Sequence, residues 1–130
     1  MMGHVLIVDD NPINLKLASE ILHAGGYTVD RAVDAEQAQV LLAALSPDLI
    51  LMDIGLPGMD GLGLTRIIKA DVRLRHVPVV AFTAFAMRGD DRKAADAGCD
   101  GYITKPIDTR RFVEQVSAIL AAARARPRDP

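Results

Sequence analysis

Carboxylates follow apolar runs at two places in this chain: Asp9 and Asp10 come directly after VLIV, and Asp53 after LILM. Isolated buried charges are costly, and charges of one sign held side by side cost more. Thr83 ends a third apolar run, VVAF, and Lys105 follows a fourth, short one. Each of these residues alone is typical of a turn, a helix cap or the surface. Together, after successive apolar runs, they indicate a site.

The charges of this set indicate the chemistry of the site. Three carboxylates carry −3 and Lys105 carries +1, so two positive charges are missing. A divalent cation supplies them, and oxygen ligands favour Mg²⁺. Beside such a cation, Asp53 could attack a phosphoryl group and form an aspartyl phosphate. Lys105 would then offset charge on the phosphoryl oxygens, and Thr83 would donate a hydrogen bond to one of them.

Short apolar or β-branched runs alternate with segments of helical period along the whole chain. The local pattern supports several boundaries: Asn11 then Pro12 begins a helix, Gly25 and Gly26 end it, and Asp34 with Gln37 resembles a capping box. The predicted strands are His4–Asp9, Tyr27–Ala32, Leu49–Asp53, Val77–Thr83 and Gly101–Thr104. The predicted helices are Pro12–Ala24, Asp34–Leu45, Leu62–Asp71, Ala86–Ala97 and Thr109–Ala123.

The polarity of the predicted strands orders them in a sheet. Runs one, three and four are continuously apolar, as in parallel strands covered on both faces, whereas run two is polar and run five is short, as at edges. This predicts an α/β fold, a flavodoxin-like doubly wound three-layer sandwich with a parallel sheet in the order 2-1-3-4-5. Ligands bind at the carboxyl edge of such sheets, where the candidate residues converge. The chain should leave β geometry at Asp9 and Asp10 so that both face one ion.

Length and composition limit the class of protein. The 130 residues suit one domain, predicted as residues 1–123 with a short disordered basic and proline-containing tail over 124–130. The net charge of −2 indicates no nucleic-acid partner, and no membrane-spanning or signal segment is evident. Cys99 is the single cysteine, which excludes a disulfide within the chain and fits a reducing cytoplasm. We expect it to pack as a small, buried apolar residue. The three histidines have no metal-ligand spacing.

Four motifs extend this interpretation, because they resemble the receiver domains of two-component response regulators over essentially the whole chain. They are VLIVDDNP, PDLILMDIGLPGMDG around Asp53, VPVVAFTAFAM around Thr83 and GCDGYITKPI around Lys105. The last two are most similar to the single-domain DivK-like regulators of cell division. The receivers of hybrid histidine kinases and of diguanylate-cyclase regulators share much of the pattern.

The resemblance implies a role for each matching position. Asp53 would accept phosphate from a histidine kinase or a phosphotransfer protein, and Lys105 would hold the phosphoryl group. Mg²⁺ would be bound by Asp9, Asp10, Asp53 and the backbone carbonyl of Gly55. Thr83 and Tyr102 would form a switch pair, the Lys105–Pro106 bond would be cis, and Gly61 would relieve the turn after the phosphorylation loop.

The resemblance also bears on phosphoryl lifetime and on output. Gly55 and Phe85 occupy positions that tune the lifetime in receivers, and neither can activate water, so slow dephosphorylation is expected. Output would pass to a downstream protein through the face of the fourth helix, fifth strand and fifth helix, which carries Phe85, Met87, Tyr102, Arg110 and Arg111. The charge set with which DNA-binding receivers dimerise on this face is not evident, so a monomer is expected.

Other classes fit less well. A haloacid-dehalogenase-type phosphatase also uses a strand-end aspartate but needs a second acid where Gly55 stands. A flavodoxin must bind phosphate at its first loop, where DDNP would repel an anion. A P-loop NTPase lacks its GKS or GKT motif here. A pseudo-receiver that only binds partners would not need the acidic set, and a receiver piece of a larger hybrid kinase or diguanylate-cyclase regulator stays open.

Overall fold

Strands and helices alternate without exception in the computed structural model, which describes residues 3–53, 61–83, 90–104 and 108–125. The elements are β1 (His4–Val8), α1 (Pro12–Ala24), β2 (Thr28–Ala32), α2 (Ala35–Ala44), β3 (Leu49–Asp53), α3 (Gly61–Ala70), β4 (Val79–Thr83), α4 (Asp90–Ala97), β5 (Gly101–Thr104) and α5 (Phe112–Ala125). No helix among these is both long and apolar enough to cross a membrane.

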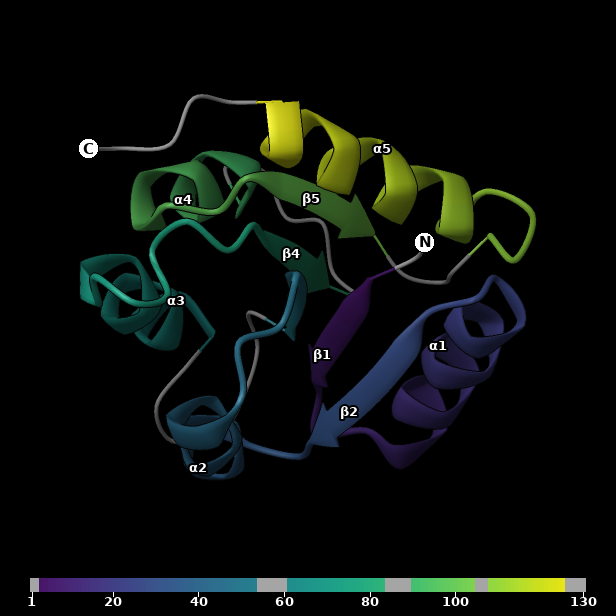
Figure 1. Ribbon diagram of the computed structural model, residues 1–130, viewed down its shortest axis with the longest axis horizontal. Helices are drawn as coiled ribbons and strands as arrows, with labels where there is room; N and C mark the ends of the chain where they lie inside the picture. The colour runs from purple at the N-terminus through teal and green to yellow at the C-terminus, as the bar shows by residue number, and fades with distance from the viewer. Residues whose placement is uncertain (1–2, 54–60, 84–89, 105–107, 126–130) are drawn as a thin grey trace.

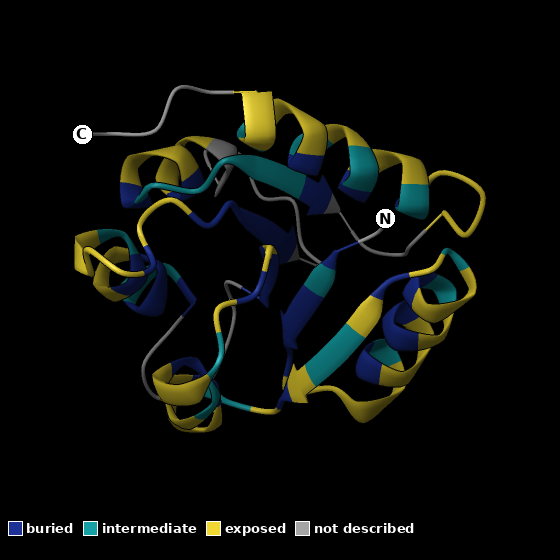
Figure 2. Cartoon of the chain, viewed as in Figure 1, coloured by how far each residue is buried: buried dark blue, intermediate teal, exposed yellow. Residues whose placement is uncertain are grey.

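The strands form one parallel sheet in the order β2-β1-β3-β4-β5, which confirms the predicted fold. Helices α1 and α5 cover one face, and α2 and α3 cover the other, with α4 packed beside α3 (Figure 1). Strand β3 is buried along its whole length, whereas β2 is partly exposed at the edge (Figure 2). The difference between apolar central strands and a polar edge strand therefore arises from burial on both faces.

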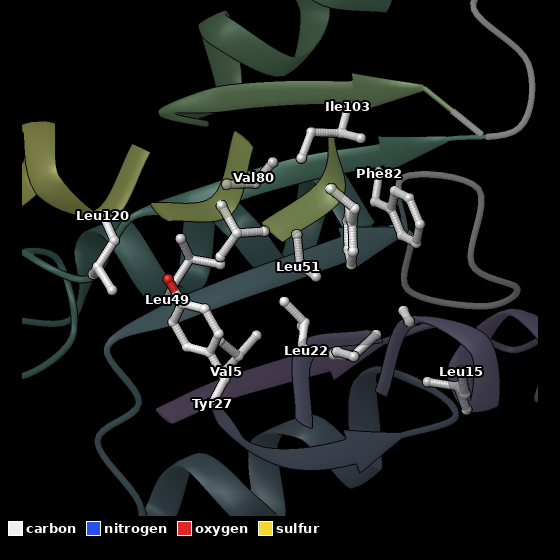
Figure 3. Packing of buried hydrophobic residues seen from close by; sticks show 14 residues of the cluster. Val5, Leu15, Leu22, Tyr27, Leu49, Leu51, Val80, Phe82, Ile103 and Leu120 are labelled. Carbon is white, nitrogen blue, oxygen red and sulfur yellow. The ribbon is translucent and has the colours of Figure 1, made fainter. Parts of the chain in front are cut away.

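Each face of the sheet has its own hydrophobic core, because successive strand residues point to opposite sides. Val5 and Ile7 of β1 pack under α1 and α5, while Leu6 and Val8 pack under α2 and α3. Figure 3 shows the first core, in which Leu15 and Leu22 of α1 meet side chains from three central strands. Its ring pair, Phe82 and Phe112, stacks with centroids 5.9 Å apart. Other members of this core include Tyr27, Leu49, Leu51, Val80, Ile103, Val116 and Leu120.

The helix ends follow local chemistry that the sequence predicted. The Asn11 side chain accepts hydrogen bonds from the amides of Ile13 and Asn14, which caps α1. At the other end Gly26 has a φ of 96°, and the amide of the next residue, Tyr27, donates to Leu22 O, as in a Schellman motif. The predicted cap of α2 is also confirmed, since the Gln37 amide donates to Asp34 Oδ1 at 2.8 Å.

Half of the predicted boundaries coincide with those of the structure, and most of the others differ by one or two residues. The larger difference is at α5, which begins at Phe112 rather than Thr109. The carbonyl of Asp108 accepts from the amides of Arg111 and Phe112, and its side chain accepts from Arg110 N, so the chain turns here before α5 begins. The α5 helix runs to Ala125 rather than Ala123. The predicted start of the fourth helix, Ala86, lies outside the described residues.

Cys99 lies half-buried at the rim of the second core, with Sγ 3.9 Å from Thr65 Oγ1. Burial is the largest influence on its thiol and raises the pKa above the ordinary value, and the charge of Asp100 acts in the same direction. The side chain therefore stays a neutral thiol at neutral pH. This agrees with the predicted packing role.

Lys69 forms a network of hydrogen bonds at the amino edge of the sheet. Nζ of Lys69 donates to the carbonyls of Arg75 and Val77, at 3.2 and 2.8 Å, and to Asp100 Oδ2 at 2.7 Å. The same Asp100 oxygen accepts from Val79 N at 2.9 Å. Both charged side chains are largely removed from solvent, with exposures of 19% and 16%. One ion pair therefore joins α3, the start of β4 and the residue that precedes β5.

We expect the substitution Lys69→Met to lower the free energy of unfolding by about 2–3 kcal/mol, because it leaves the Asp100 carboxylate and two carbonyls without their shared donor. Urea unfolding followed by circular dichroism measures the change. The matched control is Lys93→Met at an exposed position of α4, where about 0.5 kcal/mol or less is expected. Equal effects of the two substitutions would show that the Lys69 contacts contribute nothing beyond those of a surface lysine.

Candidate functional site

The register of the sheet brings two of the predicted carboxylates to the same level. Val8 of β1 pairs with Met52 of β3, so the residues that follow them, Asp9 and Asp53, stand beside each other at the carboxyl edge. The amide of Asp9 still donates to Ala32 O of β2 at 3.0 Å, which holds this residue to the sheet. Asp9 and Asp53 are therefore positioned by strands that are buried on both faces.

The third carboxylate joins them because the chain turns after Asp9. Asp9 Oδ1 accepts a hydrogen bond from Asn11 N at 2.9 Å, and β1 ends at Val8. The predicted departure from β geometry is confirmed by this turn. One carboxylate oxygen each from Asp9, Asp10 and Asp53 lies within 4.8 Å of the other two. Asp9 is fully buried, Asp53 is 8% exposed, and Asp10 is exposed.

The electrostatics of this cluster favour a hard cation. Three carboxylates at this spacing repel each other, and burial of two of them reduces the screening by water. The donors are all oxygens, which suits Mg²⁺ better than the softer metals. Asp10 lies at the surface, so the cluster is open to solvent on that side. The acidic cluster therefore fits the predicted Mg²⁺ by the chemistry of its donors.

The other predicted site residues are either placed by their positions in strands and helices or lie outside the residues that the structure describes. Asp53 pairs with Phe82, so Thr83 at the end of β4 stands one residue beyond Asp53 on the neighbouring strand. Tyr102 is half-buried in β5 and pairs with Ala81. Gly61 is the buried first residue of α3. Arg110 and Arg111 are exposed just before α5. Five predicted positions lie outside the described residues: Gly55, Phe85, Met87, Lys105 and Pro106.

An exposed apolar pair on α1 was not identified from the sequence. Ile13 and Leu17 lie one turn apart on α1, with exposures of 76% and 40%. The neighbouring Leu15, Ala18 and Leu22 form the buried row of the same helix. The apolar periodicity of α1 includes both the buried and the exposed residues. Their positions counted from the cap at Asn11 could have distinguished the two groups. Ile13 lies in the first turn of α1, three residues after Asp10 of the acidic cluster.

Comparisons with known proteins agree with this geometry. Residues 5–117 match the family described as the response regulator receiver domain. The chain is 45% identical over 123 residues to the polar-differentiation response regulator DivK of Brucella ovis, covering 95% of this chain and 100% of that protein. It is also similar to the solved signal receiver domain of a signal transduction histidine kinase from Syntrophus aciditrophicus, at 30% identity and a TM-score of 0.85, covering 98% and 97% of the two chains.

A second solved structure supports the fold alone. The chemotaxis response regulator CheY4 of Vibrio cholerae has a TM-score of 0.85 at 22% identity, over 92% of this chain and 99% of that one. The predicted resemblance to receivers, and among them to DivK-like proteins, is thus confirmed. The predicted flavodoxin-like strand order agrees with the likeness to the chemotaxis regulator.

We expect Asp10→Asn to raise the free energy of unfolding of the metal-free protein by about 1 kcal/mol, because it removes one of three neighbouring like charges. Urea unfolding in the presence of EDTA measures the effect. Glu20→Gln, at another exposed acid of α1, is the matched control and should change stability by less than about 0.5 kcal/mol. A loss of stability in Asp10→Asn would mean that neighbouring groups already compensate the repulsion.

Proposed function

Because the chain belongs to the response regulator receiver family, we propose that it is the phosphoacceptor of a two-component pathway, phosphorylated on Asp53 in a Mg²⁺-dependent reaction. The observation that carries this proposal is the grouping of Asp53 with Asp9 and Asp10 at the carboxyl edge of the sheet. The 8% exposure of Asp53 leaves it reachable at that edge.

The chemistry follows from a carboxylate nucleophile. An Asp53 oxygen attacks the phosphorus of a phosphohistidine, an O–P bond forms, and the P–N bond breaks with the electron pair returning to the imidazole. The carboxylate has no proton to lose in this step, so no general base is needed. Mg²⁺ bound by Asp9, Asp10, Asp53 and the carbonyl of Gly55 would offset charge on the phosphoryl oxygens.

The remaining roles are proposed from the positions in the sheet. Thr83, one residue beyond Asp53 on β4, would donate its hydroxyl hydrogen bond to a phosphoryl oxygen. Thr83 would move toward the phosphoryl group to form this bond, and Tyr102 on β5 would rotate into the space that it leaves. The half-buried position of Tyr102 supports this role as the second member of the switch pair. Lys105 would bind the phosphoryl group directly, and a cis bond to Pro106 would orient it.

The proposed phosphoryl donor is a histidine kinase or a histidine phosphotransfer protein. The exposed Ile13 and Leu17 support this, because they offer apolar surface to a partner on the helix that begins two residues after Asp10. The proposed output is a contact with a downstream protein through α4, β5 and α5, made by a monomeric cytoplasmic protein. The receiver family is one of signalling domains, so the only catalysis we assign is the chain's own phosphorylation and slow dephosphorylation.

A receiver within a larger kinase is the second candidate. The 30% identity to the receiver domain of a histidine kinase, over nearly all of both chains, favours it. The match to the complete length of DivK favours the single-domain form. An immunoblot of the native protein with an antibody to this domain separates them by the size of the band, about 14 kDa or several times larger.

Incubation with acetyl phosphate and Mg²⁺ should add one phosphoryl group to the wild-type protein and none to Asp53→Asn. Intact-mass spectrometry measures the adduct, and EDTA should suppress it because the cation is needed to offset the charge of the incoming group. Asp10→Asn should slow the reaction by about tenfold or more, since it removes a proposed ligand.

The controls of this experiment distinguish the alternatives. Release of free phosphate at many turnovers without an adduct would indicate an aspartate-nucleophile phosphatase. An adduct on both wild type and Asp53→Asn would place the acceptor at another residue. No adduct with acetyl phosphate or with a phosphorylated histidine phosphotransfer protein would contradict the proposal.

Dephosphorylation of the purified phosphoprotein should be slow, because Gly55 and Phe85 offer no group to position a water. We expect Phe85→Glu to accelerate the loss of the phosphoryl group by about tenfold, measured by intact mass over time. Phe85→Leu is the matched control and should keep the slow rate. Rapid loss in the wild type, or equal rates in the two variants, would contradict the assignment.

A further inference from the structure

The outer edge of β2 presents backbone groups that point away from the sheet. The amide of Thr28 donates to Gly3 O, and the carbonyl of Ala32 accepts from Asp9 N, so these two residues face β1. Backbone groups of successive strand residues point to opposite sides. The N–H and C=O groups of Val29 and Arg31 therefore point outward, beyond the last strand of the sheet.

The same two residues line a groove between β2 and α1. It has a volume of about 310 Å³, and its other lining residues are Lys16, Ser19, Glu20 and His23 of α1. Val29 and Arg31 point their side chains to the face that α1 covers, since Val29 packs against the core under α1. In Figure 1, β2 and α1 run side by side at this edge of the molecule. The groove therefore combines outward backbone donors and acceptors with a wall of side chains.

The charge of the groove is predominantly positive. Lys16 and Arg31 are exposed cations, His23 is exposed beside them, and Glu20 is the single acid in the lining. The acidic side chain of β2, Asp30, lies on the opposite face of the strand, where His4 Nε2 approaches it at 2.6 Å. A second copy of this chain would bring like charges together across a two-fold axis, which disfavours pairing of two β2 edges.

We propose that this groove binds an extended acidic segment of a partner protein, which adds as a strand to the outer edge of β2. The backbone of the segment would form hydrogen bonds with Val29 and Arg31, and its acidic side chains would meet Lys16 and Arg31. A nucleic acid has no alternating amide donors and acceptors. It could therefore pair with the positive charges but could not form the backbone hydrogen bonds along β2. The proposal does not depend on phosphorylation of Asp53.

The direct test uses an acetylated and amidated eight-residue peptide of alternating glutamate and valine, with Asp53→Asn as the host protein. Fluorescence anisotropy of the labelled peptide measures binding, and amide hydrogen exchange by NMR measures protection. In the free protein the amides of Val29 and Arg31 should exchange faster than that of Thr28. In the complex both should be protected by about tenfold or more, because they then lie in a hydrogen-bonded ladder.

Charge variants test the electrostatic part. Lys16→Glu and Arg31→Glu should each weaken binding of the peptide by about fivefold, and Glu20→Lys should strengthen it by a similar factor. The matched control is Arg66→Glu on α3, at the opposite face of the sheet, which changes the net charge equally and should leave binding within about twofold. All four residues are exposed, and circular dichroism confirms that each variant folds.

Any one of four binding results would overturn the proposal, and so would self-association through β2. The four results are the absence of binding at millimolar peptide, equal binding of a lysine–valine peptide, unchanged exchange at Val29 and Arg31 in the complex, and undiminished binding of a peptide N-methylated at alternate amides. Unchanged exchange together with charge-dependent binding would indicate surface ion pairing alone. Dimerisation of the free protein through β2, seen by analytical ultracentrifugation and abolished by Arg31→Pro, would assign the edge to a second copy instead.

Discussion

The grouping of three carboxylates at one edge of a buried sheet is the constraint on which the rest of this structure depends. Asp9 and Asp53 cannot move apart, because the register of β1 and β3 fixes them at one level and both strands are covered on both faces. Asp10 is brought to the same point by the turn that Asp9 forms with Asn11. A divalent cation bound among these oxygens would offset their like charges. The packing of the two cores against both faces of the sheet holds the strands, and with them these side chains, in place.

The two edges of the sheet carry different sets of charged side chains. At the amino edge, Asp100 meets Lys69, whose three hydrogen bonds join α3, β4 and the residue before β5. That charge is neutralised within the chain, so this edge is suited to stability. At the carboxyl edge, carboxylates of one sign are held together. The receiver family is one of signalling domains, and a change at one edge of a sheet can alter the neighbouring strands only if the sheet itself is rigid. The closed ion pair at the far edge contributes to that rigidity.

Sequence patterns predicted the strand order and the carboxylate cluster because both depend on short-range features. A continuously apolar strand is a buried one, and the residue after it reaches the sheet edge whatever the loops do. The start of α5 was less predictable, since the turn at Asp108 competes with a helix that could begin at Thr109. The Lys69 contacts could not be predicted, because they join residues up to 31 positions apart. Nor could periodicity alone decide which apolar residues of α1, Leu15 or Ile13, face the core.

The polarity of β2 shows how one sequence feature serves more than one purpose. Its exposed edge is a hazard, because unpaired backbone groups there would template association of identical chains. Arg31 on the strand and Lys16 on α1 place like charges where two copies would meet, and so they oppose that association. The same positive charges cannot oppose an acidic strand, whose backbone is as suitable for the edge as that of a second copy. The positive charges that disfavour pairing of two identical β2 edges therefore favour a partner strand of opposite charge. The same edge disfavours a second copy of this chain and can accept an acidic strand.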